Sequence, residues 1–516
     1  MSKNNSDIKQ PIILGIQDSH DASASIMRGE KILCAISEER IQRIKSMGGY
    51  PKGAIEACLN YCNLKYKDID FIALAGTRSV PVNLISTYST FSKNDYLLIQ
   101  EKIRYPKFYE NTNVPMKDVF KNYLPKGKVH YSLNQIPLKE SWELSNVEKE
   151  NIHKYRISFI SENTGVAKDK IFLIDHHMSH AYYAYYASPF RGKKVASLTM
   201  DAGGDGLYET INIFNQKGEF QKIYGDHECL IGPLYSYITL LLGMRPFEHE
   251  YKVMGLSPYS SLYESKKTFD FLCQFQELNG IQFKKTDFVK DLFWQPKNYL
   301  KSERFDGIAG GLQKFTEFFL DKWFKSAMKE THSNLFTFSG GVALNVKATK
   351  KISEIKDLSG LYIPPGPGDE SLSLGASWAL IDKLKLNTIK KSVKPLNNGY
   401  LGNEFSEKDI NIFRSNKLVK KLFKEILEDP DDFAVKLLIR GKIVAICRGR
   451  MEFGPRALGN RSILANPSIP GVVRKINESL KNRDFWMPFA PSILSEQMKK
   501  YCYVNKLCNY DYMTLA

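Results

Sequence analysis

The sequence lacks several features that assign a protein to a class at once. Its 516 residues include 8 cysteines, none in a CxxC pair, and a chain of this length does not depend on a disulfide scaffold. The longest mostly apolar run, near 235–244, is far too short to span a bilayer. The polar start, Met1 to Gln10, has no apolar stretch of a secretory signal. We therefore expect a protein of the reducing cytoplasm without a membrane partner.

Acidic residues are in the minority, with 56 Asp and Glu against 73 Lys and Arg and a net charge of +17. Such an excess suits nucleic acid or an anionic small substrate. No basic stripe interleaves with aromatic residues, so we assign the charge to a lysine-rich surface and do not expect nucleic acid. The 43% of hydrophobic residues excludes wholesale disorder, and the length predicts two to four domains.

Short apolar segments that end in polar turns mark the organisation of the chain. Residues 12–16 lead into such a turn at 17–21, and residues 195–200 lead into a second one at 201–206. Each unit continues into further strand-like segments, which predicts two related halves of an α/β fold. The Lys-, Tyr- and Asn-rich stretch 87–150 is predicted to be an insertion, and 394–403 a linker.

A pair of histidines with helical spacing is the first candidate site. His176 and His180 are four residues apart, so on a helix both side chains can point at one ion, whereas His177 points away. Asp201 and Asp369, each in a glycine-rich turn after a strand, could complete the ligand shell. Mixed histidine and carboxylate ligands suit iron, manganese or zinc. From the motif alone, a pair of capping or core histidines is an equal alternative.

Two glycine-rich turns form the second candidate site. Gly203 and Gly204 follow one strand, and Gly340 and Gly341 follow another. Glycines let the backbone approach phosphate, and a following helix presents its N-terminus to negative charge. A nucleotide loop and a purely structural turn are both consistent with this pattern.

A glycine-rich segment near the C-terminus carries the third signal. It contains Arg450, Arg456 and Arg461. Arginine side chains on such a tightly turning backbone suit the binding of a multiply charged anion such as phosphate. The alternative is a salt-bridged surface loop.

Taken together, these motifs resemble the O-carbamoyltransferases of the NodU/CmcH type. The matching stretches occur in the family's order, at 15–24, 37–40, 175–180, 251–256, 339–345, 365–369 and 450–467. The resemblance implies a first domain similar to the tRNA threonylcarbamoyl transferase, with an actin/hexokinase-like (ASKHA) α/β fold, over 1–395. It implies a YrdC-like α/β domain over 396–516. Relatives typically continue further, so we expect this second domain to be C-terminally incomplete.

The resemblance also implies a two-step reaction with Mg-ATP and a divalent metal, iron by family. The YrdC-like domain would join carbamoyl phosphate and ATP into carbamoyl adenylate, releasing pyrophosphate. The first domain would pass the carbamoyl group to a hydroxyl of a small metabolite or glycan, and an incomplete second domain would form the adenylate poorly. The implied residues are the metal ligands His176, His180 and Asp369 with Asp201 as a fourth, the nucleotide loop Gly340, Gly341 and Asn345, and the acyl-phosphate arginines Arg450, Arg456 and Arg461.

The acceptor hydroxyl needs a base near the metal, and His20 and Asp21 are the candidates. Two other functions remain open: a tRNA threonylcarbamoyl transferase-like enzyme, and a binding protein without catalysis. The arginine segment argues against the first, because those transferases lack a fused domain of this kind. Pyrophosphate release that depends on both ATP and carbamoyl phosphate would exclude the second. The chain could also form a homodimer.

Overall fold

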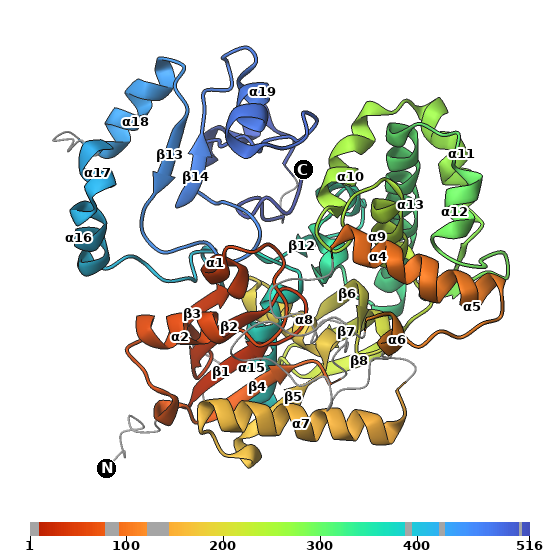
Figure 1. The fold of residues 1–516 in the computed structure, drawn as a ribbon, viewed down its shortest axis with the longest axis horizontal. Helices are drawn as coiled ribbons and strands as arrows, with labels where there is room; N and C mark the ends of the chain where they lie inside the picture. The colour runs from red at the N-terminus through yellow and green to blue at the C-terminus, as the bar shows by residue number, and fades with distance from the viewer. Residues whose placement is uncertain (1–9, 78–91, 121–143, 387–394, 423–428, 505–507) are drawn as a thin grey trace.

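The computed structural model describes residues 10–77, 92–120, 144–386, 395–422, 429–504 and 508–516. Two five-stranded sheets lie at its centre (Figure 1). The strands of the first sheet are β1 (Ile12–Gln17), β2 (Ser23–Arg28), β3 (Lys31–Ser37), β4 (Phe71–Ala75) and β5 (Ile171–Ile174). Those of the second sheet are β6 (Val195–Gly204), β7 (Leu207–Phe214), β8 (Phe220–Asp226), β11 (Leu335–Ser339) and β12 (Gly360–Tyr362).

The two sheets share one topology. In the first, the strand order is β3-β2-β1-β4-β5, with β1 antiparallel to β2 and parallel to β4. In the second, the order is β12-β11-β6-β7-β8, with β6 antiparallel to β7 and parallel to β11. Each half is therefore an antiparallel three-stranded meander extended by two parallel strands. This duplication confirms the two related halves and the actin/hexokinase-like α/β fold predicted from the sequence.

Two helices, α8 (His176–Ala187) and α15 (Leu372–Lys383), pack against each other between the sheets (Figure 1). Nearly all of their residues are buried. Their crossing requires glycine, because a Cβ on Gly375 would lie 1.8 Å from the carbonyl oxygen of Ser179. A Cβ on Gly15 of β1 would lie 2.0 Å from the carbonyl oxygen of Ser373. The pair is thus in backbone contact with its neighbours and holds a fixed position.

The outer faces of both sheets are covered by further helices. In the first half these are α1 (Glu38–Gln42), α2 (Lys52–Tyr61) and α7 (Asn146–Thr164). In the second half, α9 (Ile231–Leu241) and α13 (Phe305–Thr331) contact β6. The helices α10 (Glu250–Leu256), α11 (Leu262–Cys273) and α14 (Val346–Ser353) and the hairpin β9 (Gln276–Asn279) and β10 (Gln282–Lys285) pack on α13, and α12 (Trp294–Tyr299) belongs to the same half. The helix expected directly after the Gly340 turn is interrupted, because a 3-10 turn over Gly341–Leu344 precedes α14.

The predicted insertion, 87–150, is described in part. It contains α4 (Lys93–Ile99), a π-helical turn (Gln100–Arg104), α5 (Tyr105–Tyr109) and α6 (Met116–Val119), and α4 packs against α9. The C-terminal end of the predicted insertion, from Asn146 onward, is the start of α7, a helix of the core. Arg156 of α7 is fully buried and bonds both carboxylate oxygens of Asp18, at 2.6 and 3.1 Å. That ion pair ties α7 to the end of β1.

The C-terminal elements lie to one side of the sheets in Figure 1. They are α16 (Glu407–Ser415), α17 (Lys417–Leu422), α18 (Pro430–Ile439), the antiparallel pair β13 (Val444–Cys447) and β14 (Arg461–Leu464), α19 (Val472–Ile476) and α20 (Met498–Tyr501). The YrdC-like assignment of this region and its boundary at 395 stay predictions. All eight cysteines are free thiols. Within the described ranges, no helix is both long and apolar enough to cross a membrane.

A buried carboxyl in the second sheet generates a stability prediction. Glu209 of β7 is buried, and burial, together with nearby Asp226, raises the pKa of its carboxyl to about 9. The folded state therefore keeps a proton that the unfolded state loses near pH 4.5, so stability falls as the pH rises from about 4.5 to 9. We expect Glu209→Gln to remove the part of this dependence that comes from Glu209 and to stabilise the protein at pH 8 by about 1–3 kcal/mol.

Urea unfolding at pH 6, 7, 8 and 9 measures this effect. Glu277→Gln, on the exposed side of β9, is the matched control and should leave the pH dependence unchanged. Equal pH dependence in the wild-type protein and Glu209→Gln would contradict a buried, protonated carboxyl.

Candidate metal and anion site

The first turn of α8 is held by two aspartates. Asp175 caps the helix, its carboxylate accepting a hydrogen bond of 2.7 Å from the backbone N–H of Met178. Asp205 accepts from the backbone N–H groups of His176 (2.7 Å) and Thr77 (2.8 Å). Asp205 has φ 51°, a left-handed conformation that a short polar side chain tolerates best. Both histidines lie on one helix, as their spacing predicts, and the start of that helix is fixed from both halves.

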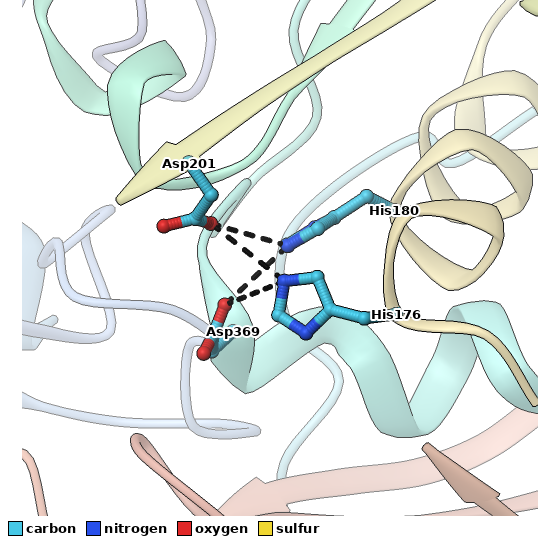
Figure 2. A group of neighbouring side chains, drawn as sticks. All are labelled: His176, His180, Asp201 and Asp369. Atoms are coloured by element: carbon cyan, nitrogen blue, oxygen red, sulfur yellow. Dashed lines mark ion pairs between the residues drawn. The ribbon is translucent and has the colours of Figure 1, made fainter. Parts of the chain in front are cut away.

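The four predicted metal ligands converge at this point (Figure 2). His180 Nε2 lies 3.4 Å from Asp201 Oδ2 and 3.4 Å from Asp369 Oδ1. His176 Nε2 lies 3.6 Å from Asp369 Oδ1 and 4.0 Å from Asp201 Oδ2. The ligand atoms all lie within 4.8 Å of one another. The histidines come from α8, Asp201 from β6 and Asp369 from the turn before α15.

These separations fit one shared ion better than direct hydrogen bonds. Two atoms that each bind a metal at about 2.1 Å in a tetrahedral arrangement lie about 3.4 Å apart. Several atoms of the cluster are buried without a hydrogen-bond partner among the described residues: His176 Nε2, both ring nitrogens of His180 and Asp369 Oδ1. Buried polar atoms normally have a hydrogen-bond partner, so these unpartnered nitrogen and oxygen atoms fit a cation bound between them.

The electrostatics of the cluster favour a positive charge. Burial by itself lowers the pKa of His176, but the carboxylates of Asp369 and Asp201 outweigh it and raise the pKa to about 9. Burial raises the pKa of Asp201, yet the two histidines hold it well below its usual range. The negative potential that attracts a proton here also attracts a divalent metal.

His177 faces away from the cluster, as the sequence predicts, and has a structural role. Its Nδ1 pairs with the hydroxyl of Thr199 at 2.7 Å, and its Nε2 with the carbonyl oxygen of Leu207 at 3.1 Å. Burial lowers the pKa of His177 to about 3, so its ring is neutral. It joins α8 to β6 and β7.

The glycines of the two predicted nucleotide turns lie around the cluster. A Cβ on Gly204 would lie 2.1 Å from the His176 ring, so this glycine makes room for the ring. Gly340 has φ 96°, and a Cβ at this position would lie 2.2 Å from the carbonyl oxygen of Met200. The backbone N–H of Gly341 donates to Asp201 Oδ2 at 2.8 Å. Gly203 has φ 147° and packs near Tyr208. These contacts position two metal-ligand candidates, and the nucleotide role of the turns stays a prediction.

Asn345 stands next to the second glycine turn and caps α14. Its Oδ1 accepts from the N–H of Ala348 at 3.0 Å, and its amide exchanges hydrogen bonds of 2.9 and 3.0 Å with the amide of Gln313. Tyr235 donates to the same Gln313 at 2.8 Å. A nucleotide bound here would meet an ordered amide pair.

The base candidates His20 and Asp21 lie close to the cluster. Their side chains form an ion pair of 3.3 Å. Burial lowers the pKa of His20, but Asp21, Asp369 and other nearby carboxylates outweigh it and raise the pKa. Burial raises the pKa of Asp21. The structure thus brings both residues within electrostatic range of the metal ligands.

Two of the three predicted anion-binding arginines donate hydrogen bonds to backbone carbonyls, and their anion-binding role stays a prediction. Arg450 donates to the carbonyls of Leu33 (2.8 Å), Leu401 (2.6 Å) and Gly402 (2.9 Å), which anchors its loop to β3. Arg461 donates to the carbonyls of Gly449 and Asn460, at 3.0 and 3.1 Å, and closes its own loop. Their guanidinium groups are occupied by structural bonds in this conformation.

Arg456 differs from the other two arginines and lies near Glu370, the sequence neighbour of Asp369. Its Nη2 donates to the carbonyl of Leu344 at 3.0 Å, while its Nη1 is buried without a hydrogen-bond partner among the described residues. Burial lowers its pKa to about 10, although Glu370, the neighbour of Asp369, opposes this shift. The resemblance assigns this arginine to the second domain and the metal ligands to the first. The arginine loop contacts the first domain, since Arg40 donates to the carbonyl of Gly454 at 2.7 Å, and the assignment of two separate sites stays a prediction.

Two residues around the site were not singled out from the sequence. Asp205 orients His176 through the backbone, and only its place in a glycine-rich turn signals this. Glu370 is buried beside Asp369, and burial raises its pKa to about 8. Its proximity to Arg456 depends on the contact of residues 86 positions apart, which local sequence patterns do not encode.

The chain matches known families and proteins over most of its length. The family model for the carbamoyltransferase N-terminus matches residues 12–378, and the model for the carbamoyltransferase C-terminus matches 435–516. An uncharacterized protein of Methanocaldococcus jannaschii is 30% identical over 95% of this chain and 80% of its own length. Nodulation protein NolNO of Sinorhizobium fredii is 25% identical over 93% of this chain and 63% of its own length.

Solved structures are more distant. Full-length HypF in a phosphate- and nucleotide-bound form has a TM-score of 0.39 and 13% identity, over 73% of this chain and 56% of that one. Component A of the (R)-2-hydroxyglutaryl-CoA dehydratase of Acidaminococcus fermentans has a TM-score of 0.35 and 12% identity, over 73% and 99%. TM-scores this low do not establish the fold, which rests on the sheet topology.

The cluster geometry predicts how the histidines differ in metal binding. His176→Ala and His180→Ala each remove one of four ligands and should lower bound metal at least tenfold, measured by elemental analysis of the purified protein. His177→Ala should keep its metal but lose stability, because it removes the buried hydrogen bonds to the Thr199 hydroxyl and the Leu207 carbonyl. Equal metal content in all three variants would disprove the assignment.

The contact between Gly204 and His176 yields a second prediction. A methyl group at Gly204 cannot fit beside the ring, so Gly204→Ala should displace the imidazole and weaken metal binding at least tenfold. Metal titration of the folded variant, followed by circular dichroism to check the fold, measures this. Unchanged metal affinity would show that His176 is not a ligand.

Proposed function

The chain belongs to the carbamoyltransferase family, as its motifs predicted, and we propose that it transfers a carbamoyl group from carbamoyl adenylate to a hydroxyl of a small metabolite or glycan. The observation that carries this proposal is the convergence of His176, His180, Asp201 and Asp369 beside two glycine turns. A divalent metal, iron by family resemblance, would be held by the four-residue cluster. When bound, it supplies a Lewis acid that polarises the carbamoyl carbonyl.

Formation of the donor consumes carbamoyl phosphate, ATP and one water, and releases phosphate and pyrophosphate. A carbamate oxygen bonds to the α-phosphorus of ATP, and the bond to pyrophosphate breaks. The Gly340–Gly341 turn and the Asn345–Gln313 pair are the candidates for holding the nucleotide. Arg456, with a buried and unpartnered Nη1, is the arginine best placed to neutralise a phosphate group.

In the transfer step, the acceptor oxygen attacks the carbamoyl carbon, and the bond between that carbon and the adenylate oxygen breaks, releasing AMP. The hydroxyl proton passes to the His20–Asp21 pair, whose side chains are 3.3 Å apart. Because both residues lie within electrostatic range of Asp369, a hydroxyl directed at the metal cluster would meet the base there.

A tRNA threonylcarbamoyl transferase-like function and a role in binding alone are the competing proposals. Pyrophosphate release that requires both ATP and carbamoyl phosphate supports the carbamoyltransferase. Absence of this release in metal-loaded protein, together with no AMP release from supplied carbamoyl adenylate, would favour a binding role.

The position of Arg456 makes a sharper prediction. Arg456→Ala should lower AMP release from supplied carbamoyl adenylate at least tenfold, because the side chain lies beside the loop of Asp369, while bound metal stays at the wild-type level. Arg461→Ala, which loses hydrogen bonds within its own loop and a contact with the Phe405 ring, is the control and should retain transfer if it stays folded. Full transfer activity in Arg456→Ala would show that this arginine takes no part in the transfer step.

A further inference from the structure

Two loops that are far apart in the sequence touch beside the candidate site. The turn before Asp369 contains Gly366, and the arginine loop contains Gly454. A Cβ on Gly366 would lie 2.8 Å from the Cα of Gly454, and a Cβ on Gly454 would lie 2.8 Å from the Cα of Gly366. Arg40 also donates to the carbonyl of Gly454 at 2.7 Å. The backbones of the two loops are therefore in direct contact.

The side chain of Glu370 lies against this contact. Its Oε1 would be 2.7 Å from a Cβ on Gly366, and its Oε2 would be 2.6 Å from a Cβ on Gly368. Glycine at both positions thus leaves room for the carboxyl group, which is part of a residue only 6% exposed. The hydroxyl of Ser23 donates to the backbone carbonyl of Glu370 at 2.7 Å and anchors it to β2.

Arg456 brings the opposite charge to the same place. Its Nη2 donates to the carbonyl of Leu344 at 3.0 Å. The side chain of Leu344 is also next to the Glu370 turn, since its Cδ1 would lie 3.6 Å from a Cβ on Gly368. Burial lowers the pKa of Arg456, and Glu370 is the negative group that opposes this shift. The two side chains therefore share a neighbour and interact through their charges.

One atom on each side chain is left without a partner. Glu370 Oε1 and Arg456 Nη1 are both buried, and neither has a hydrogen-bond partner among the described residues, so they do not bond to each other. Buried polar atoms normally have a partner. A carboxyl group keeps at least one acceptor oxygen in either protonation state, whereas a guanidinium only donates. The matching ligand donates to Glu370 and accepts from Arg456.

A carbamoyl group bonded to phosphate has these two properties side by side. Its NH2 group donates, and the phosphate oxygens next to it accept. An acetyl group has a methyl in place of the NH2 group and cannot donate. A site that hydrogen-bonds a substrate N–H rejects an analogue lacking it, because the buried acceptor is then left unpaired.

We propose that Glu370 selects the carbamoyl group of the donor: its Oε1 accepts from the NH2 group, while Arg456 Nη1 donates to the adjacent phosphate. The proposal rests on the proposed carbamoyl transfer. Glu370 contacts a part of the donor in which no bond breaks, so binding alone tests it, without metal or acceptor.

Isothermal titration of the full chain with two stable probes measures this selection. Phosphonoacetamide and acetonylphosphonate differ only in an NH2 group against a methyl group. We expect the wild-type protein to bind the amide at least tenfold more tightly. Glu370→Leu should reduce this preference to less than twofold by weakening amide binding. Glu370→Gln keeps an acceptor oxygen and should retain the preference within threefold.

Two further variants are controls. Arg456→Ala should weaken both probes by a similar factor, because both carry the phosphonate. Glu209→Leu makes the same substitution at a buried carboxyl of β7 and should leave both affinities unchanged. If Glu370→Leu fails to fold by circular dichroism, Glu370→Ala takes its place. The proposal is overturned if the wild-type protein binds neither probe, if it does not distinguish them, or if loss of the Glu370 carboxyl leaves the preference intact.

AMP release from supplied carbamoyl adenylate and acetyl adenylate extends the test to the complete donor. The wild-type protein should favour the carbamoyl compound at least a hundredfold in kcat/KM, and Glu370→Leu should reduce this factor at least tenfold. A probe preference that depends on Glu370, without AMP release from either adenylate, would refute the transfer reaction and keep the binding site. Wild-type AMP release and carbamoyl preference in Glu370→Leu would refute the role of Glu370 and keep the transfer reaction.

Discussion

The crossing of α8 and α15 is the constraint on which the site depends. At Gly375 the backbones of the two helices touch, and no other residue fits there. Since α8 carries both histidines and α15 directly follows the turn with Asp369, this crossing sets the distance between the ligands. Asp201 joins them from β6, the central strand of the second sheet. Three segments far apart in sequence thus meet at one point.

The glycines near the cluster are needed for the placement of the metal-ligand candidates. Gly204 leaves space for the ring of His176, and Gly341 directs a backbone N–H at Asp201. Glycine-rich turns after strands are commonly interpreted as phosphate loops. Here the same residues are required for the close packing of ligands and strands, so their presence alone does not identify a nucleotide site.

The parts of the fold and site that local patterns encode were predictable. Helical spacing gave the shared face of His176 and His180, and the repeated strand–turn–strand units gave the two halves. The contacts of the arginine side chains were not predictable, because Arg450 donates to carbonyl groups of β3 and of residues before its own loop. Likewise, the contact of Arg456 with Leu344 spans 112 positions. Such long-range contacts follow from packing that no short motif contains.

The central claim is that the His176, His180, Asp201 and Asp369 cluster holds a metal at which the carbamoyl donor reacts. X-ray absorption spectroscopy of the iron-loaded chain, with and without carbamoyl adenylate, tests it most directly. The account predicts two imidazole nitrogens with carboxylate oxygens at about 2.0–2.2 Å, and a changed oxygen shell when the donor is added. A spectrum without imidazole scattering, or one that the donor leaves unaltered, would contradict it.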